Sequence, residues 1–205
     1  MPRPSSRQRR QPLNPERIYR AALALIEENG ADDLSMRKLA GALGVDAMSL
    51  YHHVENKQAL LQGVFQIVQE ELDLPEPMPA DWKEALRQLG QGFHQLAQRY
   101  PRVFPPMITS PWGTEREQEI FHYIQRALQR AGVAEQDMPR ATSALYTFGI
   151  GMANVAANGL RFRPLYGEPE PVNEASAHGT SDADAQFSIE LMLAGIESLV
   201  SEGRH

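Results

Sequence analysis

The chain has 205 residues, of which 42% are hydrophobic and 22% are charged, so it can bury the core of one large domain or two small ones. It contains no cysteine, which excludes disulfide bonds and thiolate metal sites. Because no apolar run approaches the ~18 residues that a membrane-spanning helix needs, we expect a cytoplasmic protein without a membrane partner.

The net charge of −6 is distributed unevenly along the chain. Residues 1–57 hold nine Lys or Arg against seven Asp or Glu, whereas residues 58–205 hold eleven against nineteen. A basic end on an acidic protein indicates a segment that faces phosphate groups, although a disordered solubilising tail would look the same. We expect residues 1–13 to form a basic, disordered tail.

Helix signals fill the following segment, residues 14–72, and no alternating strand pattern is present anywhere in the chain. The start signals are, in chain order, Asn14 before Pro15, then Ser35, Asp46 and Asn56, and the stop signals are Gly30 and Gly44. They predict helices over 15–29, 36–43 and 47–54, and a longer one from 57 to about 72. The fold class is therefore predicted to be all-α, with a three-helix N-terminal domain and a linking helix.

The run "DLPEPMPAD" at 73–81 carries three prolines and marks the predicted domain boundary. A second domain, residues 80–203, is expected to bind a ligand and to dimerise. Asp81 with Glu84 resembles a capping box, and Thr114 with Glu117 starts another helix that stops at Gly132. Further helices are predicted over 138–158 and 182–202, with a short helix among the prolines of 101–111. The polar run 164–184 is expected to be a mobile loop.

The predicted last helix has apolar residues on two sides, whereas a surface helix of a monomer would show one apolar stripe. Phe187, Leu191 and Ala194 make one stripe, and Ile189, Leu193, Ile196 and Val200 make the other. Small residues between 149 and 157 also permit close helix packing. We therefore expect a homodimer with a four-helix interface, the alternative being a helical hairpin inside a larger monomer.

The run "LSMRKLAGALGVDAMSLYHHVENKQALL" (34–61) has the layout of a helix-turn-helix, because a helix ended by Gly44 is followed by Val45 and a helix capped by Asp46. Leu50 and Val54 anchor the second helix, which leaves its other faces for the major groove of DNA. The predicted DNA-contacting residues are Ser35, Arg37, Lys38, Ala47, Met48, Ser49, Tyr51, His52, His53 and Lys57.

Residues 15–61 resemble the DNA-binding domain of the tetracycline-repressor family through "RKLAGALGV" and "LYHHVENKQALL". Farther along, "TEREQEIFHYIQRALQRAG" and "AQFSIELMLAGIESL" resemble helices of that family's effector domain. The resemblance implies an all-helical homodimeric repressor that leaves a near-palindromic operator when a small molecule binds. It also implies that Tyr51 and Lys57 contact phosphates, that Arg37 contacts a base or a phosphate, and that residues 47–49 and His52 read bases.

Two positions depart from the tetracycline repressor. Ala47 stands where relatives carry an amide such as Gln, and an alanine offers only a methyl contact, for example to thymine. Pro111 stands where that repressor has the histidine that holds magnesium, and proline has no ligand atom. We therefore expect a different operator, and we predict no metal site and no cofactor.

Residues on the predicted helices of the second domain could line an effector pocket or simply belong to its core. The candidates are Phe93, His94, Met107, Trp112, Phe121, His122, Phe148, Met152, Asn154, Asn158 and Met192. The neighbours His52 and His53 point about 100° apart on a helix and cannot share a metal.

No catalytic motif is present: the chain lacks G-x-S-x-G, H-E-x-x-H and a phosphate-binding glycine loop, so we do not expect an enzyme. The alternative to a repressor is a small-molecule-binding or dimeric interaction module with a vestigial helix-turn-helix. A DNA affinity that does not depend on salt would favour this alternative.

Overall fold

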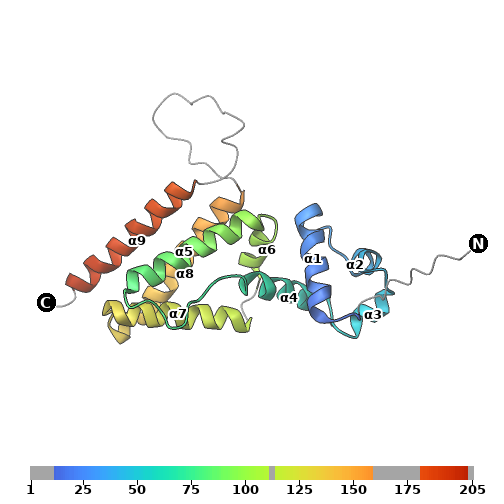
Figure 1. Cartoon of the computed structure of the whole chain (residues 1–205), viewed down its shortest axis with the longest axis horizontal. Coiled ribbons are helices and arrows are strands. Elements are labelled where there is room, and N and C mark those ends of the chain that lie inside the picture. The colour runs from blue at the N-terminus through green and yellow to red at the C-terminus, as the bar shows by residue number, and fades with distance from the viewer. Residues whose placement is uncertain (1–11, 111–113, 159–180, 203–205) are drawn as a thin grey trace, which may run out of the picture. The chain divides into compact units, whose positions relative to one another are not determined.

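The computed structural model describes residues 12–110, 114–158 and 181–202, which fold into α-helices with one short 3-10 helix and, within these ranges, no strand (Figure 1). The fold class is therefore all-α, as predicted. The chain divides into two compact units, 1–64 and 65–205, and the division falls inside one helix. Residues 1–11 of the predicted tail, Trp112, and residues 164–180 of the predicted loop lie outside the described residues.

The first unit contains α1 (Pro15–Asn29), α2 (Met36–Leu43), α3 (Ala47–Tyr51) and the start of α4 (Lys57–Gln69). Each of these helices begins after a side chain that accepts a backbone N–H. Asn14 accepts from Arg17, and the hydroxyl of Ser35 accepts from Lys38. Asp46 and Asn56 do the same for α3 and α4. All four start signals read from the sequence are thus in place.

The turn between α2 and α3 depends on Gly44, whose φ of 65° lies in the left-handed region that favours glycine. Val45 N–H then donates to the Ala40 carbonyl at 3.0 Å, which satisfies the end of α2. The core of the unit is built from fully buried apolar side chains of all four helices: Ile18, Ile26, Leu39, Leu50 and Leu60. These contacts fix α3, which at five residues is too short to be stable by itself.

The prediction that the third helix continues to residue 54 is wrong, because α3 ends at Tyr51. The N–H groups of His53 and Val54 both donate to the Leu50 carbonyl, so the chain tightens into a turn there. Val54 is still buried, as predicted, and His52 and His53 lie exposed in the turn.

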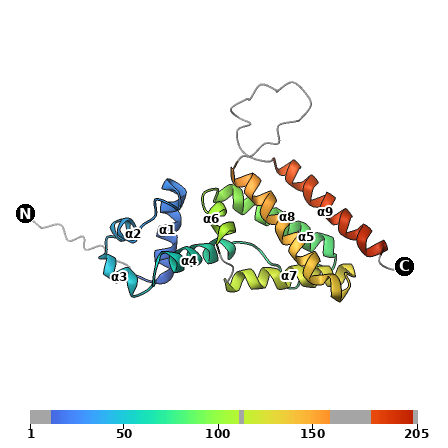
Figure 2. The ribbon, with the colours of Figure 1, turned by 180° about the vertical axis from the view of Figure 1, so that it is seen from behind.

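The second unit contains α5 (Trp82–Arg99), α6 (Phe104–Thr109), α7 (Glu115–Ala131), η1 (Glu135–Asp137), α8 (Met138–Asn158) and α9 (Asp182–Glu202). Helix α5 lies at its centre and packs against α7, α8 and α9 (Figure 2). Helix α6, the short helix predicted among the prolines, packs against α8. Residues 182–184, the end of the predicted loop, already belong to α9.

Two helix starts in this unit differ in detail from the sequence interpretation. Asp81 caps α5 by accepting from Lys83 N–H at 2.9 Å, but Glu84 does not complete a capping box. Its carboxylate instead binds Arg87 and Gln88 on the next turn. Thr114 does cap α7, because its hydroxyl accepts from Glu117 N–H at 3.1 Å.

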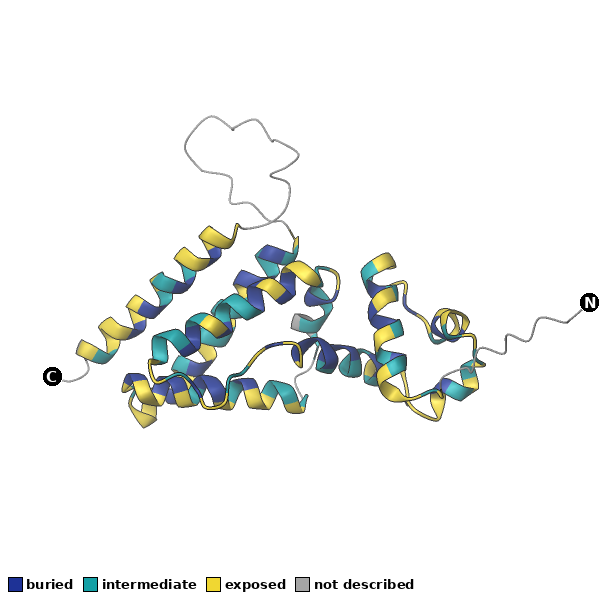
Figure 3. Cartoon of the chain, viewed as in Figure 1, coloured by how far each residue is buried: buried dark blue, intermediate teal, exposed yellow. Residues whose placement is uncertain are grey.

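The two apolar stripes of α9 have separate environments in the structure (Figure 3). Ile189, Leu193 and Ile196 are buried against the unit's own core. Phe187 and Leu191, of the other stripe, are 71% and 65% exposed. Exposed apolar side chains on one face of a helix are typical of interaction surfaces. No helix among the described residues is long and apolar enough to cross a membrane.

Candidate functional site

Helix α3 presents large side chains to solvent while one residue holds it in the core. Leu50 is fully buried, whereas Met48 and Tyr51 are 67% and 47% exposed. Ala47 and Ser49 are half-buried at the start of the helix. The outward side of α3 thus carries two large side chains and no charge, and a helix of this width fits the major groove of DNA.

The cations predicted to contact DNA gather around the loop between α1 and α2. Lys57, the first residue of α4, directs its ammonium at the Asp32 carbonyl at 3.5 Å. Lys38, in the first turn of α2, forms an ion pair with Asp33, the next residue of the same loop. Ser35 and Arg37 are exposed in the same first turn as Lys38. Positive side chains from α2 and α4 thus flank one short loop, with the N–H groups of two helix starts beside them.

A pocket in the second unit has a volume of about 50 Å³ and lies between α5, α7, α8 and α9. Of the residues predicted to line an effector pocket, Phe93, Phe148, Met152 and Met192 line it. The remaining lining residues are Leu86, Leu89, Gly90, Ile124, Leu145, Tyr146, Gly149, Ile150, Ile189 and Leu193.

The other predicted pocket residues are placed elsewhere. The buried ring of His94 directs Nε2 at Asp182 Oδ1 of α9, at 3.2 Å, and at the Gln98 amide, at 3.0 Å. His122 is exposed on α7, and Met107 is half-buried on α6. The amides of Asn154 and Asn158 bond each other along α8.

Tyr146 is the lining residue that reaches a charged group, and the sequence interpretation missed it. Its hydroxyl donates to Glu117 Oε1 at 2.8 Å, and Phe121 stacks on its ring with centroids 4.7 Å apart. Burial, together with this hydrogen bond, raises the pKa of the Tyr146 hydroxyl, so the phenol stays protonated. In the run from Leu145 to Met152 apolar residues fall on several sides of one helix, which marks the helix as buried but does not say which side faces the pocket.

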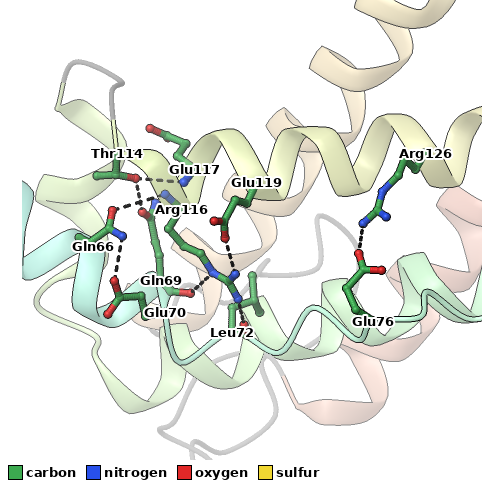
Figure 4. A network of polar contacts seen from close by, with 10 residues as sticks. All are labelled: Gln66, Gln69, Glu70, Leu72, Glu76, Thr114, Arg116, Glu117, Glu119 and Arg126. Atoms are coloured by element: carbon green, nitrogen blue, oxygen red, sulfur yellow. Dashed lines mark hydrogen bonds and ion pairs between the residues drawn. The ribbon is translucent and has the colours of Figure 1, made fainter.

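A network of polar contacts connects the start of α7 with the end of α4 (Figure 4). The Thr114 hydroxyl donates to Gln69 Oε1 at 2.7 Å. The Arg116 guanidinium donates to the carbonyls of Gln69 and Leu72, at 3.3 and 2.5 Å, and to Glu119 at 2.6 Å. Because these carbonyls belong to the last turn of α4 and the chain just after it, Arg116 caps that helix from a neighbouring element.

The same contacts join the pocket wall to α4 by consecutive hydrogen bonds. Tyr146 on α8 binds the Glu117 carboxylate, Glu117 N–H binds the Thr114 hydroxyl, and that hydroxyl binds Gln69. Helix α4 starts at Lys57 in the first unit and ends in the second. The pocket wall is therefore linked to the helix that carries Lys57.

A more polar groove of about 350 Å³ lies between the linker after α4 and α5. Its charged residues are Glu71, Asp73 and Arg99, of which Glu71 and Arg99 form an ion pair of 2.8 Å; Tyr100 donates to the Glu71 carboxylate. Among the described residues, no group of three or more His, Asp or Glu side chains is placed to hold a metal ion.

Comparison with known proteins gives the family. Residues 18–64, which include α2, α3 and the start of α4, match the model for bacterial regulatory proteins of the tetR family. The class D tetracycline repressor of Escherichia coli is 39% identical over 141 residues, which cover 68% of this chain and 64% of that protein. The repressor DrrR1 of Streptomyces coeruleorubidus is 34% identical over 146 residues, covering 69% of this chain and 53% of that protein. The chain thus spans less than two thirds of the length of either relative.

The fold has counterparts among solved structures. BioQ of Mycobacterium smegmatis superposes with a TM-score of 0.73 at 21% identity, covering 91% of this chain and 99% of that chain. With identity this low, the comparison establishes the fold. The helix-turn-helix match and the two repressors establish the lineage: the chain belongs to the tetR family of bacterial regulatory proteins.

Proposed function

We propose that the protein is a sequence-specific DNA-binding repressor that acts as a homodimer in the cytoplasm. In this proposal it leaves its operator when a small molecule occupies the pocket between α5, α7, α8 and α9. The observation that carries the proposal is α3, which exposes Met48 and Tyr51 while Leu50 fixes it to the core. Names of the matched relatives describe repressors, which agrees with this assignment.

DNA contacts in this proposal divide into two kinds. Tyr51, Lys57, Ser35 and Lys38 bind phosphates, and Arg37 binds a phosphate or a base. These contacts give affinity without sequence preference. The side chains of α3 and the following turn meet base edges, namely those of Ala47, Met48, Ser49, His52 and His53. The relative positions of the two groups support this division, because the cations surround the α1–α2 loop and α3 carries the apolar and neutral side chains.

The exposed stripe of α9 supports the homodimer. Phe187, Leu191 and Leu199 are spaced by four and eight residues, so these exposed side chains lie toward one side of the helix. On α8, a Cβ added at Gly149 or Gly151 would meet no atom within 4 Å, so these positions leave room for another helix. Two copies joined through such faces present two α3 helices to DNA, and half-sites about one turn (~34–36 Å) apart would make the operator near-palindromic.

Release by a ligand requires that the ligand bind the DNA-incompetent form more tightly than the DNA-bound form. The hydrogen bonds from Tyr146 through Glu117 and Thr114 to Gln69 support a route for this effect. A ligand that displaces Tyr146 would alter the contacts at the end of α4, and α4 continues into the DNA-binding unit. The state of α4 would then depend on the state of the pocket.

The experiment that tests the proposal selects genomic fragments with the purified protein at about 150 mM salt, where non-specific binding is weak. The protein is first unfolded in urea and refolded, which strips any bound ligand. We expect a near-palindromic site to be enriched, and the enrichment to be lost in Tyr51→Ala. His122→Ala, which changes an exposed aromatic residue of α7, should retain it. Failure to enrich any site would favour a ligand-binding module with a vestigial helix-turn-helix.

A further inference from the structure

We infer that Asp33 competes with the phosphates of DNA for Lys38, and so lowers the affinity of the protein for any DNA sequence. This inference rests on the proposed function, in which Lys38 binds a phosphate. It is carried by the ion pair between the two side chains, by the backbone contacts that fix both residues, and by the different partner of Lys57.

Asp33 and Lys38 belong to a short segment whose backbone is held in place at both ends. Leu34, directly after Asp33, is buried, and its N–H donates to the Ala31 carbonyl at 3.3 Å. The N–H of Lys38 donates to the hydroxyl of Ser35, the cap of α2, at 3.3 Å. The backbone therefore brings the carboxylate and the ammonium together, and only the two side chains lose freedom when they pair.

The ion pair is open to solvent on the unit that is proposed to bind DNA. The side chains of Lys38 and Asp33 are 52% and 45% exposed, so a phosphate can reach the ammonium. An exposed ion pair contributes little to stability, and another anion can replace the carboxylate. A phosphate that does so gains a cation but leaves the Asp33 carboxylate unpaired beside the DNA. Because these two effects oppose each other, Lys38 adds little net attraction in the wild-type protein.

Lys57, which flanks the same loop, has a different partner. Its ammonium is directed at the Asp32 carbonyl at 3.5 Å, and a carbonyl carries no net charge. This partner does not cancel the positive charge of Lys57, whereas the Asp33 carboxylate cancels that of Lys38. The two lysines should therefore contribute unequally to DNA binding, although both were predicted to contact DNA.

The release of counterions from DNA gives the size of the expected effect. Each phosphate that a lysine neutralises adds about −0.9 to the slope of log affinity against log salt. In Asp33→Asn the charge of Lys38 is no longer cancelled, so this contribution should appear in full. If the contribution vanishes near about 1 M salt, the variant should bind DNA about 5-fold tighter at about 150 mM and about 15-fold tighter at about 50 mM.

The test measures the fluorescence anisotropy of a fluorescein-labelled DNA duplex of arbitrary sequence. The duplex is titrated with full-length, urea-stripped protein at salt concentrations between about 50 and 300 mM, and non-specific binding suffices because phosphate contacts do not depend on sequence. Asp33→Asn should bind more tightly, with a slope steeper by about 0.9. Asp137→Asn controls for total charge: Asp137 is exposed in η1 of the second unit, and its variant should bind as wild type does. Circular dichroism and thermal unfolding confirm that the variants fold.

Lys38→Ala shows whether the gain comes from the ion pair, because the two substitutions form a double-mutant cycle. Added to Asp33→Asn, it removes both charges, so the affinity and the slope should return close to those of wild type. Alone, it leaves the Asp33 carboxylate uncompensated and should bind more weakly than wild type. A gain that persists in the double variant would overturn the inference, because Asp33 would then act by repelling phosphates and not by holding Lys38.

An Asp33→Asn variant that binds with wild-type affinity and slope would also overturn the inference. If the wild-type protein binds the duplex and its affinity falls with salt, this result refutes the role of Asp33 and leaves the proposed function standing. If wild type and Asp33→Asn both fail to bind the duplex at about 50 mM salt, the proposed function is refuted, and the inference with it.

Discussion

The hydroxyl of Thr114 donates a 2.7 Å hydrogen bond to Gln69, and so fastens the first turn of α7 to the last turn of α4. The same hydroxyl accepts the N–H of Glu117 at 3.1 Å, so one side chain both caps α7 and satisfies Gln69. Gln69 is only 5% exposed, and water is poorly placed to replace this partner. The arrangement requires a group that donates and accepts at one atom, which a hydroxyl does.

Thr114→Val should destabilise the protein by about 2–3 kcal/mol. The substitution removes the cap of α7 and leaves the Gln69 amide oxygen without its donor. Thr114→Ser keeps the hydroxyl and should cost no more than about 0.5 kcal/mol. Urea unfolding followed by circular dichroism measures both. Equal losses in the two variants would mean that the methyl group, and not the hydrogen bonds, matters at this position.

Lys57→Ala should weaken binding to every DNA sequence and lower the slope of log affinity against log salt by roughly one, because one phosphate contact is lost. Lys83→Ala is the charge-matched control, since Lys83 lies on α5 and pairs with Glu197. Filter binding or fluorescence anisotropy over a range of salt concentrations gives the slope. An unchanged slope in Lys57→Ala would remove this residue from the phosphate contacts.

Met48→Ala should change which operator is preferred while leaving the salt slope intact, because Met48 carries no charge and faces outward on α3. A lost contact to a base edge alters discrimination at that base pair by about 1–3 kcal/mol. Selection of operators from a randomised pool shows the altered position. If Met48→Ala and Lys57→Ala behave alike, the separation into base contacts and phosphate contacts is wrong.

Much of the fold could be predicted from the sequence because its helices begin at residues whose side chains are typical N-caps. Asn14, Ser35, Asp46 and Thr114 each accept a backbone N–H where the sequence places a cap. The end of α3 could not be predicted in this way. Apolar spacing extends the helix to Val54, whereas in the structure the N–H groups of His53 and Val54 share the Leu50 carbonyl and the chain turns after Tyr51.

The pocket was harder to predict than the helices that form it. Phe93, Phe148, Met152 and Met192 were chosen because large or flexible apolar residues often line ligand sites, and all four lie on the pocket wall. His94 was chosen for its chemistry, yet its ring turns toward Asp182 and Gln98. Helix α5 packs against α8 and α9, and this packing decides which side of each helix faces the pocket. Residue spacing within one helix does not reveal how that helix packs against the others. Tyr146 was missed for this reason.

Leu191→Glu should separate the proposed dimer, because it places a charge at the centre of the exposed apolar stripe of α9. We expect the dimer dissociation constant to rise by about 100-fold or more, since the carboxylate would be buried without a partner. Analytical ultracentrifugation over a dilution series measures it. Gln129→Glu adds the same charge to an exposed position of α7 and should leave the dimer intact. A wild-type protein that is monomeric at all concentrations would refute the dimer itself.

The ion pair between Arg87 on α5 and Glu190 on α9 should make stability depend on pH in the acidic range. Arg87 donates to both carboxylate oxygens, at 2.5 and 3.2 Å, and these bonds hold the pKa of Glu190 below its ordinary value of 4.5. A carboxylate whose pKa is lower in the folded than in the unfolded state stabilises the fold fully above the unfolded pKa. That contribution is lost as the pH falls through the folded pKa.

Wild type should therefore be more stable than Arg87→Met at about pH 7, and the two should converge as the pH falls below about 4. Glu190→Gln should show the same convergence, because it removes the carboxyl group whose pKa the ion pair lowers. Urea unfolding at each pH measures the difference, at one protein concentration so that association does not contribute. Curves for wild type and Arg87→Met that stay parallel down to low pH would assign the loss to packing of the arginine stem between α5 and α9. In that case the charge of Glu190 would contribute nothing to holding α9 in place.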